Sequence, residues 1–341
     1  MNIFEGCFIL DNNRVIYDVK GFEHPPNGYI VFPRYVPDDS GDRVFRGIRY
    51  SKIYALKLRF DYMRKHFPRL LVYDDIFGRE IPILYKSMIK EVFDPKTWVE
   101  KAIKNRFNLD SIEKKALDFI ELLTEHTGLD TTNFGVSGSI CIGIHKSDSD
   151  LDIIVYGTSE SRKVMATLAR LFRDGVISRY SEKEYRQLYY EREVDGIVNY
   201  DLFLMHEKRK YFQGIYNGKR FFIRFLRDIN ENPCYGEYRY RQLGKVKITA
   251  KVLDDSESIY TPCKYIIEPI RIDYEKKLEL RRDAMWTIES FRGKFCQHAF
   301  RNETVEVYGN LEIVYKSQKL DRYRILLGES KEDYMISILD K

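Results

Sequence analysis

Alternating and helical patterns of hydrophobic residues divide the chain into predicted elements. Near the start, GCFIL and RVIYDV flank the turn sequence DNN, which predicts a hairpin, and GYIVFPRYVP predicts a further strand. YALKLRFDYMRKHF then carries apolar residues at helical spacing, while PRLLVYDD and GREIPILY return to short strand patterns. We therefore predict an N-terminal α+β module over residues 1–107.

The clearest helical pattern follows in SIEKKALDFIELLTEHTG. Asp110 is expected to cap this helix, Glu113 stands at the capping-box position, and Gly128 supplies a left-handed stop. The apolar stripe that the helix would bury consists of Ile112, Ala116, Phe119, Ile120 and Leu123.

Two further regions complete the predicted organisation. NFGVSG, LDIIVYG and VNYDLFLM are interpreted as strands and SESRKVMATLARLFRDG as a helix, which gives an α/β domain over residues 108–210. A β-rich C-terminal domain is predicted over residues 211–341, with one helix around Leu278–Phe291. Its predicted strands are FFIRFL, KVKITAKVL, SIYTPCKYIIEP, ETVEVYG and LEIVY.

Composition narrows the class of protein. The 341 residues are 44% hydrophobic and 32% charged, which is typical of a globular chain, and the net charge of +5 does not by itself indicate a nucleic-acid partner. No apolar run approaches 18 residues, so neither a membrane span nor a secretory signal is expected. The five scattered cysteines predict the reducing cytoplasm, and five glutamines beside many Lys, Arg and Glu favour a thermophile. Cys141 is expected in the core, and Cys263, Cys296 and His298 lack zinc-site spacing.

The stretch with a chemical pattern is GVSGSICIGIHKSDSDLDIIVYG, residues 135–157. Gly138 and Ser139 follow an apolar strand and open a short helix, where unpaired backbone N–H groups can face a phosphate. Asp150 and Asp152 are two residues apart at the start of a strand, so their side chains share one face. Two adjacent carboxylates favour a bound cation, and Mg²⁺ prefers such oxygen ligands together with substrate phosphates.

The order G-S, ten residues, then D-L-D within SDLDIIV resembles the signature of the DNA polymerase beta nucleotidyltransferase superfamily. The resemblance implies a core of mixed sheet with helices, a nucleoside triphosphate substrate and two Mg²⁺ or Mn²⁺ ions held by three carboxylates. The third carboxylate is expected on a later strand, and Asp201 within VNYDLFLM fits that position, with Asp195 as the alternative. GYIVFPRYVP, GKRFFIRF, SIYTPCKY and ESFRGKF are similar to phrases of archaeal predicted nucleotidyltransferases, a group without an assigned acceptor.

Several residues near this motif have two interpretations. Gly138 and Ser139 would hold the triphosphate or form an ordinary turn. Ser149 would orient a carboxylate or only satisfy the turn, and His145 and Lys146 would reach a phosphate or lie in a solvated loop.

Arginine and tyrosine residues are interleaved further along the chain, as in surfaces that bind nucleic acid and also in ordinary sheet edges. The candidates for RNA or DNA binding are Arg220, Arg224, Arg227, Arg239, Arg241, Tyr238 and Tyr240. The sequence thus predicts a metal-dependent nucleotidyltransferase that moves an NMP from an NTP to a hydroxyl, with a nucleic-acid 3′ end among the acceptors. The alternative is a non-catalytic nucleic-acid-binding or regulatory protein on the same scaffold. The base preference, the acceptor and the oligomeric state stay open.

Overall fold

The computed structural model describes residues 3–194, 196–274 and 280–338. The chain forms two compact units whose segments alternate along the sequence. The first unit contains Met1–Val72, Ile81–Tyr180 and Tyr211–Asn232; the second contains Tyr73–Glu80, Ser181–Lys210 and Pro233–Lys341. These boundaries do not follow the three consecutive modules, which stay a prediction from the sequence.

The N-terminal part of the first unit is built on a sheet with the strand order β4-β5-β3-β2-β1-β8. The predicted hairpin is confirmed, since β1 and β2 pair antiparallel around the DNN turn, and the strands expected in GYIVFPRYVP, PRLLVYDD and GREIPILY are confirmed as β3, β6 and β7. The strands are β1 (Phe8–Asp11), β2 (Ile16–Val19), β3 (Gly28–Pro37), β4 (Arg43–Phe45), β5 (Ile48–Lys52), β6 (Leu71–Asp74), β7 (Arg79–Tyr85) and β8 (Ile89–Phe93).

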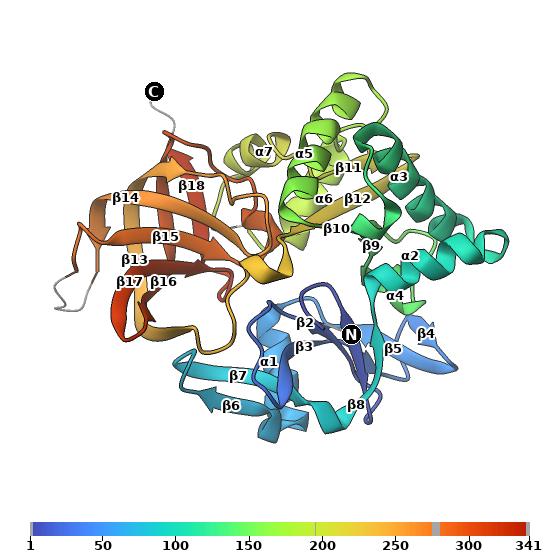
Figure 1. Ribbon diagram of the computed structural model, residues 1–341, viewed down its shortest axis with the longest axis horizontal. Helices are drawn as coiled ribbons and strands as arrows, with labels where there is room; N and C mark the ends of the chain where they lie inside the picture. The colour runs from blue at the N-terminus through green and yellow to red at the C-terminus, as the bar shows by residue number, and fades with distance from the viewer. Residues whose placement is uncertain (1–2, 195, 275–279, 339–341) are drawn as a thin grey trace. The chain divides into compact units, whose positions relative to one another are not determined.

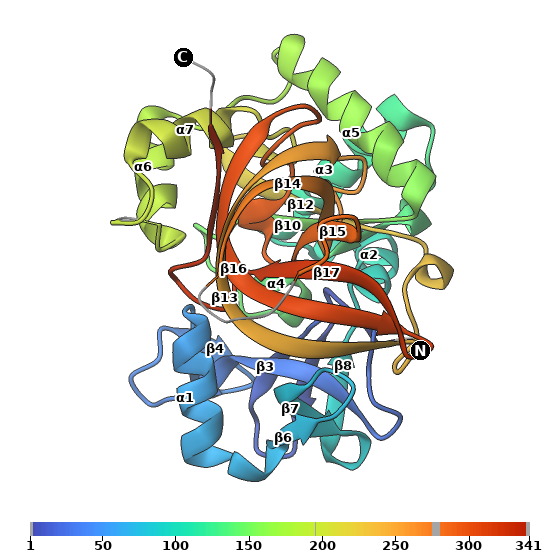
Figure 2. The same cartoon turned by 90° about the vertical axis from the view of Figure 1, so that its left-hand side faces the viewer.

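Helices of the first unit follow the capping signals in the sequence. α3 (Ser111–Thr127) begins with the predicted capping box of Asp110 and Glu113, ends at the left-handed Gly128, and buries the whole predicted stripe. α1 (Leu56–His66) is the expected helix of the N-terminal module and contacts β3 (Figure 2). The others are α2 (Pro95–Lys104), α4 (Gly138–Ile142) and α5 (Thr158–Arg173).

A four-stranded sheet with the order β11-β12-β10-β9 forms the centre of the first unit. The apolar strand β10 lies between the short antiparallel strand β9 and β12, with which it pairs in parallel. Helices α3 and α5 both contact β10, as Figure 1 shows. The strands are β9 (Phe134–Val136), β10 (Leu151–Tyr156), β11 (Gln213–Tyr216) and β12 (Lys219–Leu226).

The N-terminal sheet packs directly on this central region. A buried cluster joins Phe8, Tyr35 and Tyr50 of the N-terminal sheet to Ile142 and Ile144, which follow the start of α4. At the chain's start, the Ser137 hydroxyl donates to the Gly6 carbonyl, and the buried Glu5 forms an ion pair with Arg224 of β12. Residues before β1 are thereby tied to the central sheet.

The second unit contains a closed ring of strands. β13, β14, β15, β17 and β16 pair in that order, and β13 also pairs with β16, so the sheet closes into a barrel (Figure 2). The predicted helix around Leu278–Phe291 is wrong where it is described, because Met285–Ser290 is a strand; residues 278 and 279 lie outside the described residues. The strands are β13 (Tyr238–Asp254), β14 (Cys263–Asp273), β15 (Met285–Ser290), β16 (Thr304–Lys316), β17 (Lys319–Leu327) and β18 (Tyr334–Ile338).

The second unit also contains α6 (Glu182–Glu191) and α7 (Tyr200–Lys208). The mixed α+β class is confirmed. Cys141 is buried, as expected. Within the described ranges, no helix combines the length and the apolar character needed to cross a bilayer.

Candidate functional site

Asp152 lies directly against Gly138, and this contact defines the candidate site. Gly138 opens α4 in a left-handed conformation with φ +62°, and a Cβ atom there would lie 2.0 Å from Asp152 Oδ2. Only glycine therefore leaves room for the carboxylate over the first turn of α4. The backbone of Asp152 is held at the same place, because its carbonyl accepts from the Ser137 N–H at 2.8 Å.

Asp150 stands just before β10 and faces a cation from the neighbouring strand. Arg220 Nε of β12 lies 3.4 Å from Asp150 Oδ1. The parallel register pairs Leu151 with Phe221 and Asp152 with Phe222, so Arg220 occupies the position opposite Asp150. The strands β9, β11 and β12 contain neither Asp nor Glu, so the third carboxylate predicted on a strand beside β10 does not exist in this sheet.

The expected strand around Asp201 is a helix, which corrects the sequence interpretation. Asp201 lies in the first turn of α7, where the Asn199 side chain caps the helix by accepting from the Leu202 N–H at 2.9 Å. The reason for placing Asp201 beside the other two aspartates is therefore lost. The alternative, Asp195, lies outside the described residues. Among the residues that are described, no three His, Cys, Asp or Glu side chains gather into a metal-binding group.

Ser139 and Ser149 are buried and hydrogen-bond to each other, with 3.3 Å between their hydroxyl oxygens. Ser149 also accepts from the Lys146 N–H at 2.9 Å, so it closes the turn before β10. His145 Nε2 lies 2.7 Å from Asp110 Oδ2, and Lys146 forms an ion pair with Asp42. These side chains fix the loop between α4 and β10 and thereby the backbone that carries Asp150.

The N-terminal sheet brings three cations to the site that sequence reasoning missed. Arg34 of β3, Arg43 of β4 and Lys52 of β5 come from adjacent strands, and Arg43 Nη1 donates to the Ile144 carbonyl at 2.9 Å. Burial lowers the pKa of Lys52 to about 8; the positive charges of Arg34 and Arg43 act in the same direction, while Asp152 and Asp150 oppose it. We call Arg34, Arg43 and Lys52 the basic cluster.

The sequence contains no local pattern that links the basic cluster to the aspartates. Its members lie on strands of the N-terminal module, about 100 residues before Asp150. Tyr35 lies near the same charged groups. Burial raises the pKa of Tyr35, the charges of Arg34 and Arg43 lower it, and the charge of Asp152 raises it further.

The predicted nucleic-acid-binding residues are divided between the two units. Arg220 and Arg224 lie in the first unit and form ion pairs with Asp150 and Glu5. In the second unit, Tyr240 is buried and stacks on Phe77 with ring centroids 5.5 Å apart, so it offers no free face to a base.

The other predicted nucleic-acid-binding residues of β13 lie alternately on its two faces. Arg239 and Arg241 are exposed on β13, whereas Tyr238 is half-buried beside Lys316 and Arg322. Arginine and tyrosine thus point to opposite sides of β13. Arg227 follows β12 and is half-buried.

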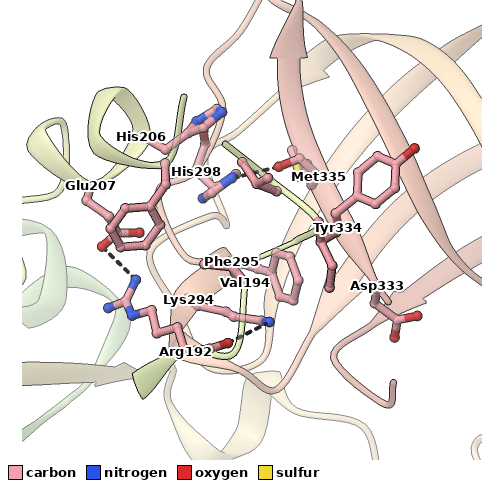
Figure 3. A pocket seen from close by; sticks show the side chains of 13 residues that line it. Arg192, Val194, His206, Glu207, Lys294, Phe295, His298, Asp333, Tyr334 and Met335 are labelled. Carbon is pink, nitrogen blue, oxygen red and sulfur yellow. Dashed lines mark hydrogen bonds and ion pairs between the residues drawn. The ribbon is translucent and has the colours of Figure 1, made fainter. Parts of the chain in front are cut away.

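A pocket lies within the second unit, lined by residues of α7, the chain before it and the barrel (Figure 3). His206 and His298 stack there with ring centroids 4.0 Å apart, and burial lowers the pKa of both, to about 4 for His206. The Ser337 N–H donates to His206 Nε2, so the proton of the neutral ring is on Nδ1, which donates to the His298 carbonyl.

The buried carboxylate at this pocket is paired within the protein. Glu207 accepts from Arg192 and from Lys210, each at 2.6 Å, and Lys294 donates to the Arg192 carbonyl at 3.4 Å. Glu207 is thus fully paired, whereas the buried His298 Nδ1 makes no hydrogen bond to a described residue.

Comparison with known proteins identifies a relative. Uncharacterized protein MJ1086 of Methanocaldococcus jannaschii is 27% identical over 336 residues, and the alignment covers 96% of this chain and 96% of the relative. No protein-family model matches the chain, and no solved structure matches it. An archaeal homologue of nearly equal length thus exists, and it carries no assigned activity.

Proposed function

We propose that the chain is a nucleotidyltransferase that binds a nucleoside triphosphate with Mg²⁺ at Asp150 and Asp152, beside the first turn of α4. The observation that carries the proposal is the contact of Asp152 with Gly138. The Asp152 carboxylate lies over the first turn of α4, and any side chain at position 138 would collide with it. A triphosphate would bring its own oxygens to the same ion, which suits a cation that keeps part of its shell for substrate.

The residues present fit one metal ion better than two. Asp150 and Asp152 supply two carboxylates from one strand start, and Arg220 already stands beside Asp150. When bound, Mg²⁺ would neutralise the phosphate charge that develops during transfer. Asp150 and Asp152 would hold the ion, and Gly138 leaves the Asp152 carboxylate its place over the first turn of α4.

The test is transfer of label from each α-³²P-labelled NTP with Mg²⁺, with and without total RNA as acceptor. Wild type should label RNA, a small molecule or a protein hydroxyl, and Asp152→Asn should reduce the labelling by at least 100-fold while leaving the fold intact. Asp148→Asn is the matched control, because Asp148 is an exposed carboxylate in the same loop. Undiminished labelling by Asp152→Asn would contradict the proposed site.

A second candidate is a nucleotide-binding regulatory protein without turnover, and one observation favours it. Arg220 stands opposite Asp150 on the strand where the resemblance implies a third carboxylate. An arginine cannot accept a proton from an attacking hydroxyl. The two candidates differ in one measurement: a regulatory protein would bind the triphosphate and release it unchanged, so no acceptor would carry label.

A further inference from the structure

The basic cluster lies on the side of the N-terminal sheet that faces the aspartates. Lys52 pairs with Tyr35 across β3 and β5, so the two side chains share one face of the sheet. Tyr35 belongs to the buried cluster with Ile142 and Ile144 at the end of α4. That cluster fixes the face of the N-terminal sheet against the loop that carries Asp150.

Positive charge exceeds negative charge at this place. Arg34, Arg43 and Lys52 are half-buried, and within the described part of the chain none of them forms an ion pair with a carboxylate; Arg34 and Arg43 donate to backbone carbonyls. The Lys52 ammonium has a neutral neighbour instead, the ring of Tyr54, with its nitrogen 4.6 Å from the ring centroid. Half-buried like charges repel, so an anion that binds between these three cations would relieve the repulsion.

We infer that the basic cluster binds the phosphate chain of the nucleotide, so that the N-terminal sheet supplies the triphosphate-binding side of the site; this inference rests on the proposed function. A triphosphate carries several negative charges on tetrahedral groups, which suits two guanidinium forks and one ammonium on adjacent strands. The carboxylates Asp150 and Asp152 cannot provide this binding themselves, because they repel phosphate unless a metal ion lies between them. The N-terminal sheet and the central sheet thus contribute different parts of one ligand site.

Lys52 is the residue on which to test this inference. Its ammonium makes no hydrogen bond to another described residue, and it stands among other cations. Lys52→Met keeps the aliphatic stem and removes the charge. The variant should melt at the wild-type temperature or above it, because a half-buried repulsion is relieved, and it should still lose affinity for triphosphate.

The experiment is calorimetric titration with ATP, GTP, CTP, UTP and inorganic tripolyphosphate, each with Mg²⁺ and with EDTA. Lys52→Met should bind tripolyphosphate and the preferred NTP roughly 10- to 100-fold more weakly than wild type, as expected for loss of a charged hydrogen bond to phosphate. The matched control is Lys57→Met on α1, whose side chain is 84% exposed and paired with Asp61; its affinity should stay within about twofold of wild type.

Three outcomes separate this inference from the proposed function. Equal triphosphate affinity of Lys52→Met and wild type overturns the inference and leaves the proposed transfer standing. Absence of triphosphate binding by wild type, with and without Mg²⁺, overturns both. Binding through Lys52 without label transfer supports the inference and removes the proposed enzyme activity in favour of a regulatory one.

Discussion

Replacement of Gly138 by alanine should displace Asp152. The added Cβ would lie 2.0 Å from Asp152 Oδ2, and ordinary contact begins at 3.4 Å, so the carboxylate has to move by about 1.4 Å. Gly143, at the other end of α4, is the matched control: it is also left-handed, with φ +76°, and a Cβ there meets nothing within 4 Å. Both substitutions thus share the backbone strain, and only one displaces a carboxylate.

The difference between the two variants is the informative quantity. A left-handed alanine costs about 1–2 kcal/mol of unfolding free energy at either position. Gly138→Ala should cost a further ~0.5–1.5 kcal/mol, because Asp152 is forced away from its preferred side-chain conformation. If Asp152 acts as proposed, a displacement of more than about 1 Å should also lower label transfer by roughly 100-fold.

Urea unfolding and label transfer measure these effects, and a double-mutant cycle isolates their cause. In an Asp152→Ala background the clash with the carboxylate is gone and only the Cβ of residue 152 remains, at 3.1 Å, so Gly138→Ala should cost little more than Gly143→Ala. An equal cost of Gly138→Ala with and without the Asp152 carboxylate would refute the reasoning, since the strain would then come from the backbone alone.

Two further predictions concern the second unit. Glu312→Gln should lower the unfolding free energy by about 1.5–3 kcal/mol, because buried Arg324, whose Nε lies 2.6 Å from Glu312 Oε2, loses one of its two carboxylate partners and keeps Glu289. Glu306→Gln on the same strand, in a more exposed pair, should cost about 0–1 kcal/mol in the same urea titration. His206, whose pKa burial lowers from 6.5 to about 4, should make stability fall as the pH drops from 6.5 to 4, by on the order of 3 kcal/mol, because only the unfolded chain then takes up the proton. His206→Gln should make stability depend less on pH in this range, whereas the exposed control His126→Gln should keep the wild-type dependence. If the His206→Gln profile were as steep as these two, the lowered pKa of His206 would be contradicted.

The elements that sequence predicts well are those with local signals. The capping box at Asp110, the stop at Gly128 and the helical stripe between them specify α3 without reference to the rest of the fold. The DNN turn likewise specifies the β1–β2 hairpin. In these cases the interactions that decide the structure lie within one element or its immediate neighbours.

The wrong prediction that Asp201 lies on a strand beside β10 has a non-local cause. VNYDLFLM and KRFFIRFL are both short apolar runs after α5, and such runs fit a helix or a strand equally well. The Asn199 cap turns the first run into α7, while the second run becomes β12 and pairs with β10. Choice between the two depends on which run reaches the edge of β10, and a single sequence does not contain that information.

The candidate site was predictable only in part for the same reason. Gly138, Asp150 and Asp152 lie in one local motif and could be selected from their spacing. Lys52 joins them through packing of the N-terminal sheet on Ile142 and Ile144, a contact between residues about 100 positions apart. Conversely, Tyr240 lies in a segment rich in arginine and tyrosine, as nucleic-acid-binding surfaces are, but its ring stacks on Phe77 inside the second unit.

The alternation of segments between the two units has a consequence for synthesis on the ribosome. β10 ends at Tyr156, but its parallel partner β12 ends at Leu226, 70 residues later, after α5, α6 and α7. At roughly 5–20 residues per second, one edge of this mostly apolar strand stays unpaired for about 4–14 s until β12 has been synthesised. During that interval the nascent chain presents an unpaired strand edge, which is the kind of surface that chaperones retain. A chain terminated at Lys210 would keep that edge permanently, so expression of residues 1–210 alone should give an aggregating product.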